Sequence, residues 1–197
     1  MPTRGFDMSR LSNIIASFFA QARMDDEATL DVGCGTGTFG IVLTAVRRTN
    51  KPYLVGIDLY EPYLFMIPAN IYDAIVQACA THLPFRSKCF NNVVSIAVIE
   101  HLEKYNGYKM IEEMERVAKK LVIIMTTKGF IPKNADDNPF QRHRSGWDSK
   151  EFRRRNYNVR FLPDFGDIKW VLFPFILIHR LGLNAKLIMA YKHQNNR

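Results

Sequence analysis

The chain has 197 residues, of which 47% are hydrophobic and 23% are charged. This composition argues against intrinsic disorder and predicts a single domain over residues 1–197 with a packed core. The 27 basic and 19 acidic residues give a net charge of +8, so nucleic acid, an anionic membrane or an acidic small molecule could be a partner.

The excess of basic residues is confined to the last part of the chain. Residues 1–140 hold 15 basic and 15 acidic residues, whereas residues 141–197 hold 12 basic and 4 acidic residues. Any partner that recognises positive charge is therefore expected to bind residues 141–197.

The cysteines predict a reducing compartment. Cys34, Cys79 and Cys89 are odd in number and include no C-x-x-C pair. A disulfide framework and a structural zinc site are both disfavoured by this pattern. We expect a cytoplasmic protein without a bound metal.

The first predicted element is an amphipathic helix within residues 1–26. Its apolar residues recur at helical spacing: Leu11, Ile14, Ile15, Phe18 and Phe19. Asp7 and the polar residues between these positions argue against a secretory signal peptide. The apolar stretch 170–178 is too short to span a bilayer, so we expect no transmembrane segment.

Apolar runs alternate with amphipathic segments through residues 27–128. Strands are predicted at residues 28–32, 53–58, 73–79, 92–99 and 121–127. Helices are predicted at residues 38–48, 60–70 and 108–120. This alternation indicates βαβ units, and hence a mostly parallel, doubly wound α/β sheet with helices on both faces.

Residues 129–197 have a different character. Residues 129–147 are rich in Pro, Asn and Asp and predict a long loop, a feature that is usually functional in a compact domain. Asp148 is a good N-cap for a basic helix that ends near Asn156. Strands are predicted at residues 159–162 and 185–192, and the last strand is expected to be antiparallel.

A glycine-rich turn follows the first predicted strand, and two interpretations of it compete. Gly35-x-Gly37-x-x-Gly40 with Asp58 further on satisfies the dinucleotide-binding pattern. Gly33-x-Gly35-x-Gly37 preceded by Asp31 is instead the form expected for S-adenosylmethionine.

The position of the strand favours the second interpretation. The strand ends near Val32, so the tight turn begins at Gly33 rather than at Gly35. An acidic Asp31 at the strand end suits a cationic ammonium group, whereas it would repel a pyrophosphate.

The chain resembles the class I S-adenosylmethionine-dependent methyltransferases, in particular the ubiquinone-biosynthesis-type (type 11) branch. The matching segments, in order, are residues 31–37, 56–59, 80–85 and 91–102, which end in Glu-His-Leu. The resemblance covers about half of the chain and implies a Rossmann-like fold, with S-adenosylmethionine as the cofactor of residues 27–128.

The resemblance also implies a set of cofactor-binding residues. These are Asp31, Gly33, Cys34, Gly35, Gly37, Asp58, Leu59, Cys79, Ala80, Thr81, Ser95 and Ile96. Within this set, Asp31 and Gly33 would hold the methionine end and Asp58 the ribose. Cys79 departs from the family pattern, which often has an aspartate there for the adenine amino group.

Methyl transfer from a sulfonium is an in-line displacement, so the protein mainly aligns the reactants and excludes water. A general base is needed only when the nucleophile carries a proton. His101 and His143 are the candidate bases, although a histidine in the position of His101 is more often structural. Glu100 is expected to orient its neighbours.

The loop after the fifth strand is the expected acceptor side. Arg142, Arg144 and Trp147 would suit an anionic or aromatic acceptor. The alternative is a solvated basic loop that Trp147 anchors to the core.

The identity of the methyl acceptor stays open at this stage. The apolar stretch 170–178 favours a small-molecule or lipid-like acceptor and allows peripheral membrane contact. RNA is the second candidate, because of the basic C-terminal part. A non-catalytic, cofactor-binding scaffold is the third.

Overall fold

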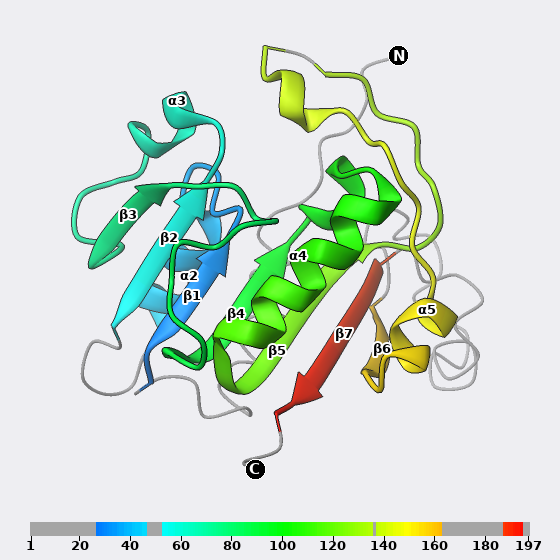
Figure 1. The fold of residues 1–197 in the computed structure, drawn as a ribbon. Coiled ribbons are helices and arrows are strands. Elements are labelled where there is room, and N and C mark those ends of the chain that lie inside the picture. The colour runs from blue at the N-terminus through cyan, green and yellow to red at the C-terminus, as the bar shows by residue number, and fades with distance from the viewer. Residues whose placement is uncertain (1–26, 47–52, 136, 163–186, 195–197) are drawn as a thin grey trace, which may run out of the picture.

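The computed structural model describes residues 27–46, 53–135, 137–162 and 187–194 (Figure 1). The predicted N-terminal helix and the apolar stretch 170–178 lie outside these residues. The described strands are β1 (Thr29–Val32), β2 (Leu54–Asp58), β3 (Ala74–Gln77), β4 (Phe90–Ile96), β5 (Ala118–Thr127), β6 (Asn158–Leu162) and β7 (Leu187–His193). The described helices are α2 (Thr38–Val46), α3 (Glu61–Leu64), α4 (Lys104–Val117) and α5 (Ser149–Arg154), with 3-10 turns η1 (Ile99–His101) and η2 (Pro139–Gln141).

The described strands form one sheet in the order β3-β2-β1-β4-β5-β7-β6. The neighbours from β3 to β5 are parallel, and β7 lies antiparallel between β5 and β6. Strand β1 pairs with β2 on one side and with β4 on the other, so the chain changes direction across the sheet at β1. A ligand binds at such a switch point, beyond the carboxyl ends of the strands. The predicted fold class, with its antiparallel last strand, is confirmed.

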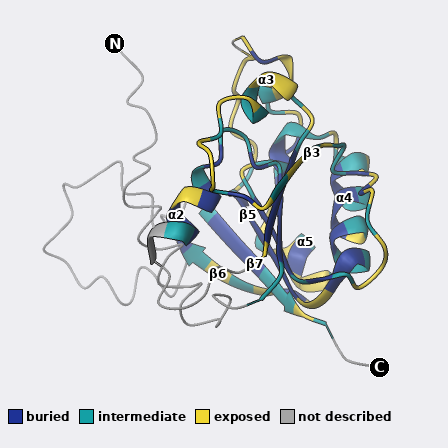
Figure 2. Cartoon of the chain, turned by 90° about the vertical axis from the view of Figure 1, so that its left-hand side faces the viewer, coloured by how far each residue is buried: buried dark blue, intermediate teal, exposed yellow. Residues whose placement is uncertain are grey.

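Alternating side chains of the strands pack into two hydrophobic layers, as the two-residue period of a strand requires. Val93 and Val122 belong to the layer that α4 covers, whereas Val94 and Ile123 belong to the layer that α2 covers. Figure 2 shows the two helices on opposite sides of the sheet. Helix α5 adds Phe152 to the layer on the α4 side.

Helix α3 is much shorter than the helix predicted over residues 60–70. It covers only Glu61–Leu64. Pro68 cannot continue a helical hydrogen-bond ladder, and Asn70 has a left-handed backbone with φ of 68°. The segment therefore turns back toward β3 instead of extending along the sheet.

Two other predicted boundaries also move. Helix α4 begins at Lys104 rather than at residue 108 and ends at Val117, because residues 118–120 already belong to β5. Strand β4 ends at Ile96 instead of residue 99, since Ala97 has a φ of 54° that no regular strand allows.

The long loop and the following cap are as predicted. Residues between β5 and α5 contain only the short turn η2 among those that the structure describes. The side chain of Asp148 accepts hydrogen bonds from the backbone N–H groups of Lys150 and Glu151, and the Glu151 side chain completes a capping box. In Figure 1 this loop lies beyond the ends of the parallel strands, on the same side as α3.

Candidate functional site

A cavity of about 340 Å³ opens at the carboxyl ends of the central parallel strands. Its walls come from segments that are far apart in the sequence. One wall is made of Gly33, Gly35, Ile57, Asp58, Leu59, Ala78, Cys79, Ala80 and Thr81. The other is made of Ala97, Val98, His101, Leu102, Glu103, Asn106, Asn138, Phe140, Gln141 and Arg144. The cavity therefore joins the predicted cofactor half to the predicted acceptor side.

The glycine loop forms part of the first wall of this cavity. The N–H groups of Gly33 and Cys34 both donate to the carbonyl of Ile57, each at 2.8 Å, so the loop curls over the end of β2. Gly33 has a φ of +76°, and a Cβ there would lie 2.2 Å from Cγ2 of Val98. Only glycine fits this combination of left-handed backbone and close approach. The backbone is thereby exposed to whatever fills the cavity.

Asp58 is held at the edge of the cavity by two backbone donors. Its Oδ2 accepts from Gly35 N–H at 2.9 Å, and its Oδ1 accepts from Tyr60 N–H at 2.8 Å. Each carboxylate oxygen can accept a further hydrogen bond. The arrangement fixes two hydrogen-bond acceptors, the Asp58 carboxylate oxygens, beside the glycine loop, and this pair fits a ligand with vicinal hydroxyl groups.

Asp31 lies below the glycine loop rather than on the cavity wall. It is 1% exposed, and the Tyr72 hydroxyl donates to its Oδ2 at 2.6 Å. Burial raises the pKa of Asp31 to about 7, the Tyr72 hydrogen bond opposes that rise, and the charge of Asp58 adds to it. Sequence reasoning missed Tyr72, because no motif or spacing links it to a residue 41 positions earlier.

The third glycine of the alternative dinucleotide pattern has a packing role. A Cβ on Gly40 would lie 2.6 Å from Cγ2 of Ile71 and 2.7 Å from Cζ of Tyr72. The Gly40 N–H donates to the Tyr72 hydroxyl at 3.2 Å. The Tyr72 ring thus accounts for Gly40, whereas Gly33 and Gly35 line the cavity.

The rest of the first wall, beyond Asp58, comes from Leu59 and from the turn after β3. Leu59, Cys79, Ala80 and Thr81, which are predicted cofactor residues, all line the cavity. Cys79 Sγ and Thr81 Oγ1 are 3.1 Å apart, and Thr81 Oγ1 is 2.9 Å from His82 Nδ1. This chain of contacts orders the turn where the family often has an aspartate.

Besides Asp31, four predicted cofactor residues do not reach the described cavity wall: Cys34, Gly37, Ser95 and Ile96. The Cys34 thiol is buried, with Sγ 3.0 Å from the Cβ position of Gly56, and burial raises its pKa. Ser95 Oγ donates to the carbonyl of Val32 at 2.8 Å and so joins β4 to β1. The Cys34 and Ser95 side chains therefore support the glycine loop and the strands beside it rather than line the cavity.

His101 is the predicted base that lines the cavity, whereas His143 stands behind it. The two ring centroids are 4.8 Å apart. His101 Nδ1 is 3.3 Å from the carbonyl of Arg142, and His143 Nδ1 is 2.6 Å from the carbonyl of Ile131. Because a carbonyl only accepts, both Nδ1 atoms carry the hydrogen and both Nε2 atoms are acceptors.

Both histidines are held in the neutral form. Burial, and then the neighbouring His143, lower the pKa of His101 to about 4. Burial likewise lowers the pKa of His143. At pH 7 the neutral His101 can accept a hydrogen bond from the molecule that receives the methyl group, but it is a weak base.

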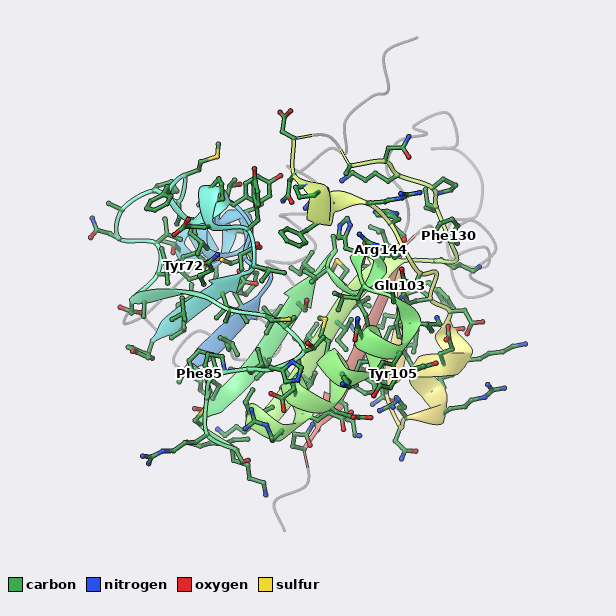
Figure 3. All side chains as sticks on the ribbon, turned by 45° about the horizontal axis from the view of Figure 1, so that its top comes forward. Tyr72, Phe85, Glu103, Tyr105, Phe130 and Arg144 are labelled. Carbon is green, nitrogen blue, oxygen red and sulfur yellow. The ribbon has the colours of Figure 1, made fainter. Side chains whose placement is uncertain are left out.

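The predicted acceptor side is only partly assembled at the cavity. Arg144 lines it and forms a surface ion pair with Glu103 at 3.6 Å (Figure 3). Arg142 is exposed and is not on the described wall. Phe140, which sequence reasoning did not single out, lines the cavity and meets Tyr60 with ring centroids 6.3 Å apart.

The prediction that Trp147 contacts the acceptor is wrong. Trp147 is 1% exposed, and its indole N–H donates to Ser145 Oγ at 2.9 Å. Lys104 Nζ lies 3.8 Å from the ring centroid, and the ring fills the space above Gly107. The indole therefore anchors the loop to α4, which was the alternative interpretation.

Glu100 is a second buried carboxylic acid behind the cavity. Its Oε2 accepts from Thr126 Oγ1 at 2.8 Å, and its backbone carbonyl accepts from the N–H groups of Arg144 and Ser145 at 2.8 and 3.1 Å. Burial raises its pKa to about 7. Glu100 thus fastens the acceptor-side loop to β4 and β5, in agreement with the predicted orienting role.

Comparison with known proteins assigns this arrangement to a family. Residues 30–125, which include the glycine loop and Asp58, match a family model described as a methyltransferase domain. The chain is a class I S-adenosylmethionine-dependent methyltransferase. The type 11 branch and the cofactor that the motifs implied are confirmed with it.

Solved structures share the fold of this methyltransferase. Magnesium protoporphyrin IX methyltransferase from Synechocystis, solved with bound S-adenosylmethionine, has a TM-score of 0.63 at 13% identity, over 95% of this chain and 79% of that chain. A protein from Pyrococcus horikoshii has a TM-score of 0.68 at 14% identity, over 98% and 93% of the two chains.

Curated relatives match the methyltransferase over different lengths. An uncharacterized protein of Methanocaldococcus jannaschii is 26% identical over 180 residues, which are 86% of this chain and 75% of that protein. The tRNA (carboxymethyluridine(34)-5-O)-methyltransferase of Arabidopsis thaliana is 29% identical over 110 residues, or 55% of this chain and 26% of that enzyme. The methyltransferase thus spans about a quarter of the Arabidopsis enzyme.

None of the helices in the described part of the methyltransferase is long and apolar enough to cross a bilayer. The same residues contain no cluster of three or more His, Cys, Asp or Glu side chains that could hold a metal ion.

Proposed function

We propose that the methyltransferase transfers the methyl group of S-adenosylmethionine to a small-molecule acceptor that carries an anionic group. Bound S-adenosylmethionine would supply an electrophilic methyl on a sulfonium. The observation that carries the proposal is the single cavity, in which the glycine loop and Asp58 lie on one wall and His101 and Arg144 on the other.

The first wall suits the cofactor. The two oxygens of Asp58, already oriented by Gly35 and Tyr60, accept hydrogen bonds from the ribose hydroxyls. The exposed backbone at Gly33 admits the methionine part, and the turn around Ala80 faces the adenine. These contacts hold the cofactor so that the acceptor approaches from the opposite wall.

The second wall suits an acceptor with negative charge. Among the described residues, Arg144 forms an ion pair only with exposed Glu103, and a surface pair of this kind contributes about 0–1 kcal/mol. An anionic acceptor can therefore displace Glu103 from the guanidinium at little cost. Phe140 and neutral His101 give this wall an apolar surface and one hydrogen-bond acceptor.

The proposal is tested by incubating the protein with methyl-labelled S-adenosylmethionine and a native cell extract that is fractionated into lipids, RNA, proteins and small molecules. We expect the label in an acidic small-molecule fraction. Label in lipid or protein only would contradict the small-molecule proposal. Cofactor binding with no labelled fraction at all would favour a non-catalytic, cofactor-binding scaffold.

Arg144→Ala and Arg142→Ala form a matched pair for the acceptor site, because both remove one positive charge from the same loop. We expect Arg144→Ala to raise the acceptor KM about tenfold without changing the cofactor Kd, since a charge-assisted contact is lost. Arg142→Ala, whose side chain is off the described wall, should leave both constants unchanged. Equal effects of the two variants would contradict a specific role for Arg144.

RNA is the second candidate acceptor. The names of several relatives identify them as tRNA methyltransferases, and 12 of the 27 basic residues lie in residues 141–197. This candidate predicts label in the RNA fraction and a steep dependence of binding on salt. It also predicts that Arg142→Ala and Arg144→Ala weaken binding to a similar extent.

A further inference from the structure

We propose that Tyr72 is a positioning residue for the methionine end of the cofactor, and that it acts through the carboxylate of Asp31. The inference rests on the proposed function, and on the role that the resemblance implies for Asp31, which is to hold the cationic methionine end of the cofactor. It adds a residue that lies outside every sequence motif of the site.

The Tyr72 hydroxyl joins two parts of the loop that carries the cofactor. It donates to Asp31 Oδ2 at 2.6 Å and accepts from Gly40 N–H at 3.2 Å. Asp31 is at the end of β1, and Gly40 is in the first turn of α2. One hydroxyl group therefore sets the relative position of the strand and the helix that border the glycine loop.

The surrounding glycines make room for this one ring. The Cβ positions of Gly37, Gly40 and Gly56 lie 3.5, 2.7 and 3.0 Å from atoms of Tyr72. The ring is 8% exposed, and Figure 3 shows it at the end of the sheet where α3 and β3 lie. Because the ring is confined on these sides, its hydroxyl is held in one place.

The electrostatics around Asp31 explain why the hydroxyl matters for a cation. Among the described residues, the titratable groups found to interact with Asp31 are Tyr72, Asp58 and the Cys34 thiol, none of which is a cation. Burial favours the protonated form of Asp31, whereas the Tyr72 hydrogen bond favours the ionised form. Loss of that bond raises the pKa of Asp31, so fewer molecules present the negative charge that an ammonium group requires.

The test is calorimetric titration of wild type and Tyr72→Phe with S-adenosylmethionine and with methylthioadenosine, which lacks the amino-acid part. At pH 7, we expect Tyr72→Phe to weaken S-adenosylmethionine binding about tenfold, as for one hydrogen bond to a charged group, and to leave methylthioadenosine binding unchanged. The ratio of the two S-adenosylmethionine Kd values should shrink toward one at about pH 8.5, where Asp31 is ionised in both proteins. The amino group of S-adenosylmethionine titrates in the same way in the measurements on wild type and on Tyr72→Phe, so it does not change this ratio. Tyr53→Phe, at a tyrosine that is 57% exposed, is the control and should change nothing.

A double-mutant cycle with Asp31→Asn separates positioning from a general structural effect. In the Asp31→Asn background, Tyr72→Phe should change S-adenosylmethionine binding less than about twofold, and the pH dependence should be absent. Three results would overturn the inference: an unchanged Kd in Tyr72→Phe, equal weakening of both ligands, or the same loss in both backgrounds. Melting temperatures show whether each variant folds. If Tyr72→Phe does not fold, Asp31→Asn still tests the carboxylate. This variant must weaken the binding of S-adenosylmethionine and leave the binding of methylthioadenosine unchanged. If wild type fails to bind S-adenosylmethionine, the proposed function fails instead.

Discussion

Replacing Gly33 by alanine tests whether close backbone packing is what requires glycine at the end of β1. Two costs are expected. A left-handed backbone costs a non-glycine residue about 1–2 kcal/mol. The new Cβ would also lie 2.2 Å from Cγ2 of Val98, and forcing a methyl group into a packed site costs about 1–3 kcal/mol more. We therefore expect Gly33→Ala to lower the free energy of unfolding by about 2–5 kcal/mol.

Gly129 offers a matched control for this prediction. Its φ is +75°, against +76° at Gly33, but apart from its chain neighbours no atom of the described residues lies within 4 Å of its Cβ position. Gly129→Ala should therefore cost only the backbone part, about 1–2 kcal/mol. Val98→Ala in the Gly33→Ala background should recover part of the loss, because it removes the methyl groups that clash.

The assay is urea unfolding of the cofactor-free proteins, followed by calorimetric titration with S-adenosylmethionine. The slopes of the unfolding curves should agree, so that the midpoints report stability alone. Gly33→Ala should also weaken cofactor binding, whereas Gly129→Ala should not. Equal destabilisation of the two variants would refute the reasoning from close approach, and unaltered cofactor binding in Gly33→Ala would refute the location of the site.

Further predictions concern the carboxylates and His101. Asp58→Asn should weaken S-adenosylmethionine binding about tenfold, because an amide offers one hydrogen-bond acceptor instead of two; an unaltered calorimetric Kd would exclude the ribose contact. The folded-state pKa of Glu100, about 7, lies above its ordinary value of 4.5, so its stabilising contribution is complete below pH 4.5 and is lost as the pH rises through 7. Glu100→Gln should therefore gain about 1–3 kcal/mol of stability relative to wild type between about pH 5 and pH 8 in urea unfolding, and a difference that does not vary with pH would be inconsistent with the buried acid. The His101 ring, whose pKa is lowered to about 4, should stay neutral at pH 5 in an NMR titration, and a proton on both ring nitrogens at pH 6 would contradict its burial.

The parts of the site that follow from local pattern were predictable. The continuous apolar run of β5 and the cluster of glycines after β1 are visible in the sequence because strand burial and a tight turn each demand particular residues in succession. Asp58, the last residue of β2, was found because an acidic residue about 20 positions after the glycines belongs to both ligand-binding patterns. The capping box at Asp148 is likewise a short-range pattern.

The parts that depend on tertiary packing were not predictable. Tyr72 reaches Asp31 only because β3 lies beyond β2 in the sheet, and no spacing rule expresses that relation. A tryptophan in a basic loop is typical of a ligand contact, yet the Trp147 indole packs in the core because Gly107 on α4 leaves space for it. Helix α3 was overestimated, because apolar residues in its predicted continuation suggested a helical face that Pro68 interrupts.

The most direct test of the account is calorimetric titration of the wild-type protein with S-adenosylmethionine and, separately, with NAD. The cavity bordered by Gly33, Gly35 and Asp58 predicts binding of S-adenosylmethionine at one site per chain, which Asp58→Asn weakens, and no binding of NAD. Tight binding of NAD together with no binding of S-adenosylmethionine would contradict it.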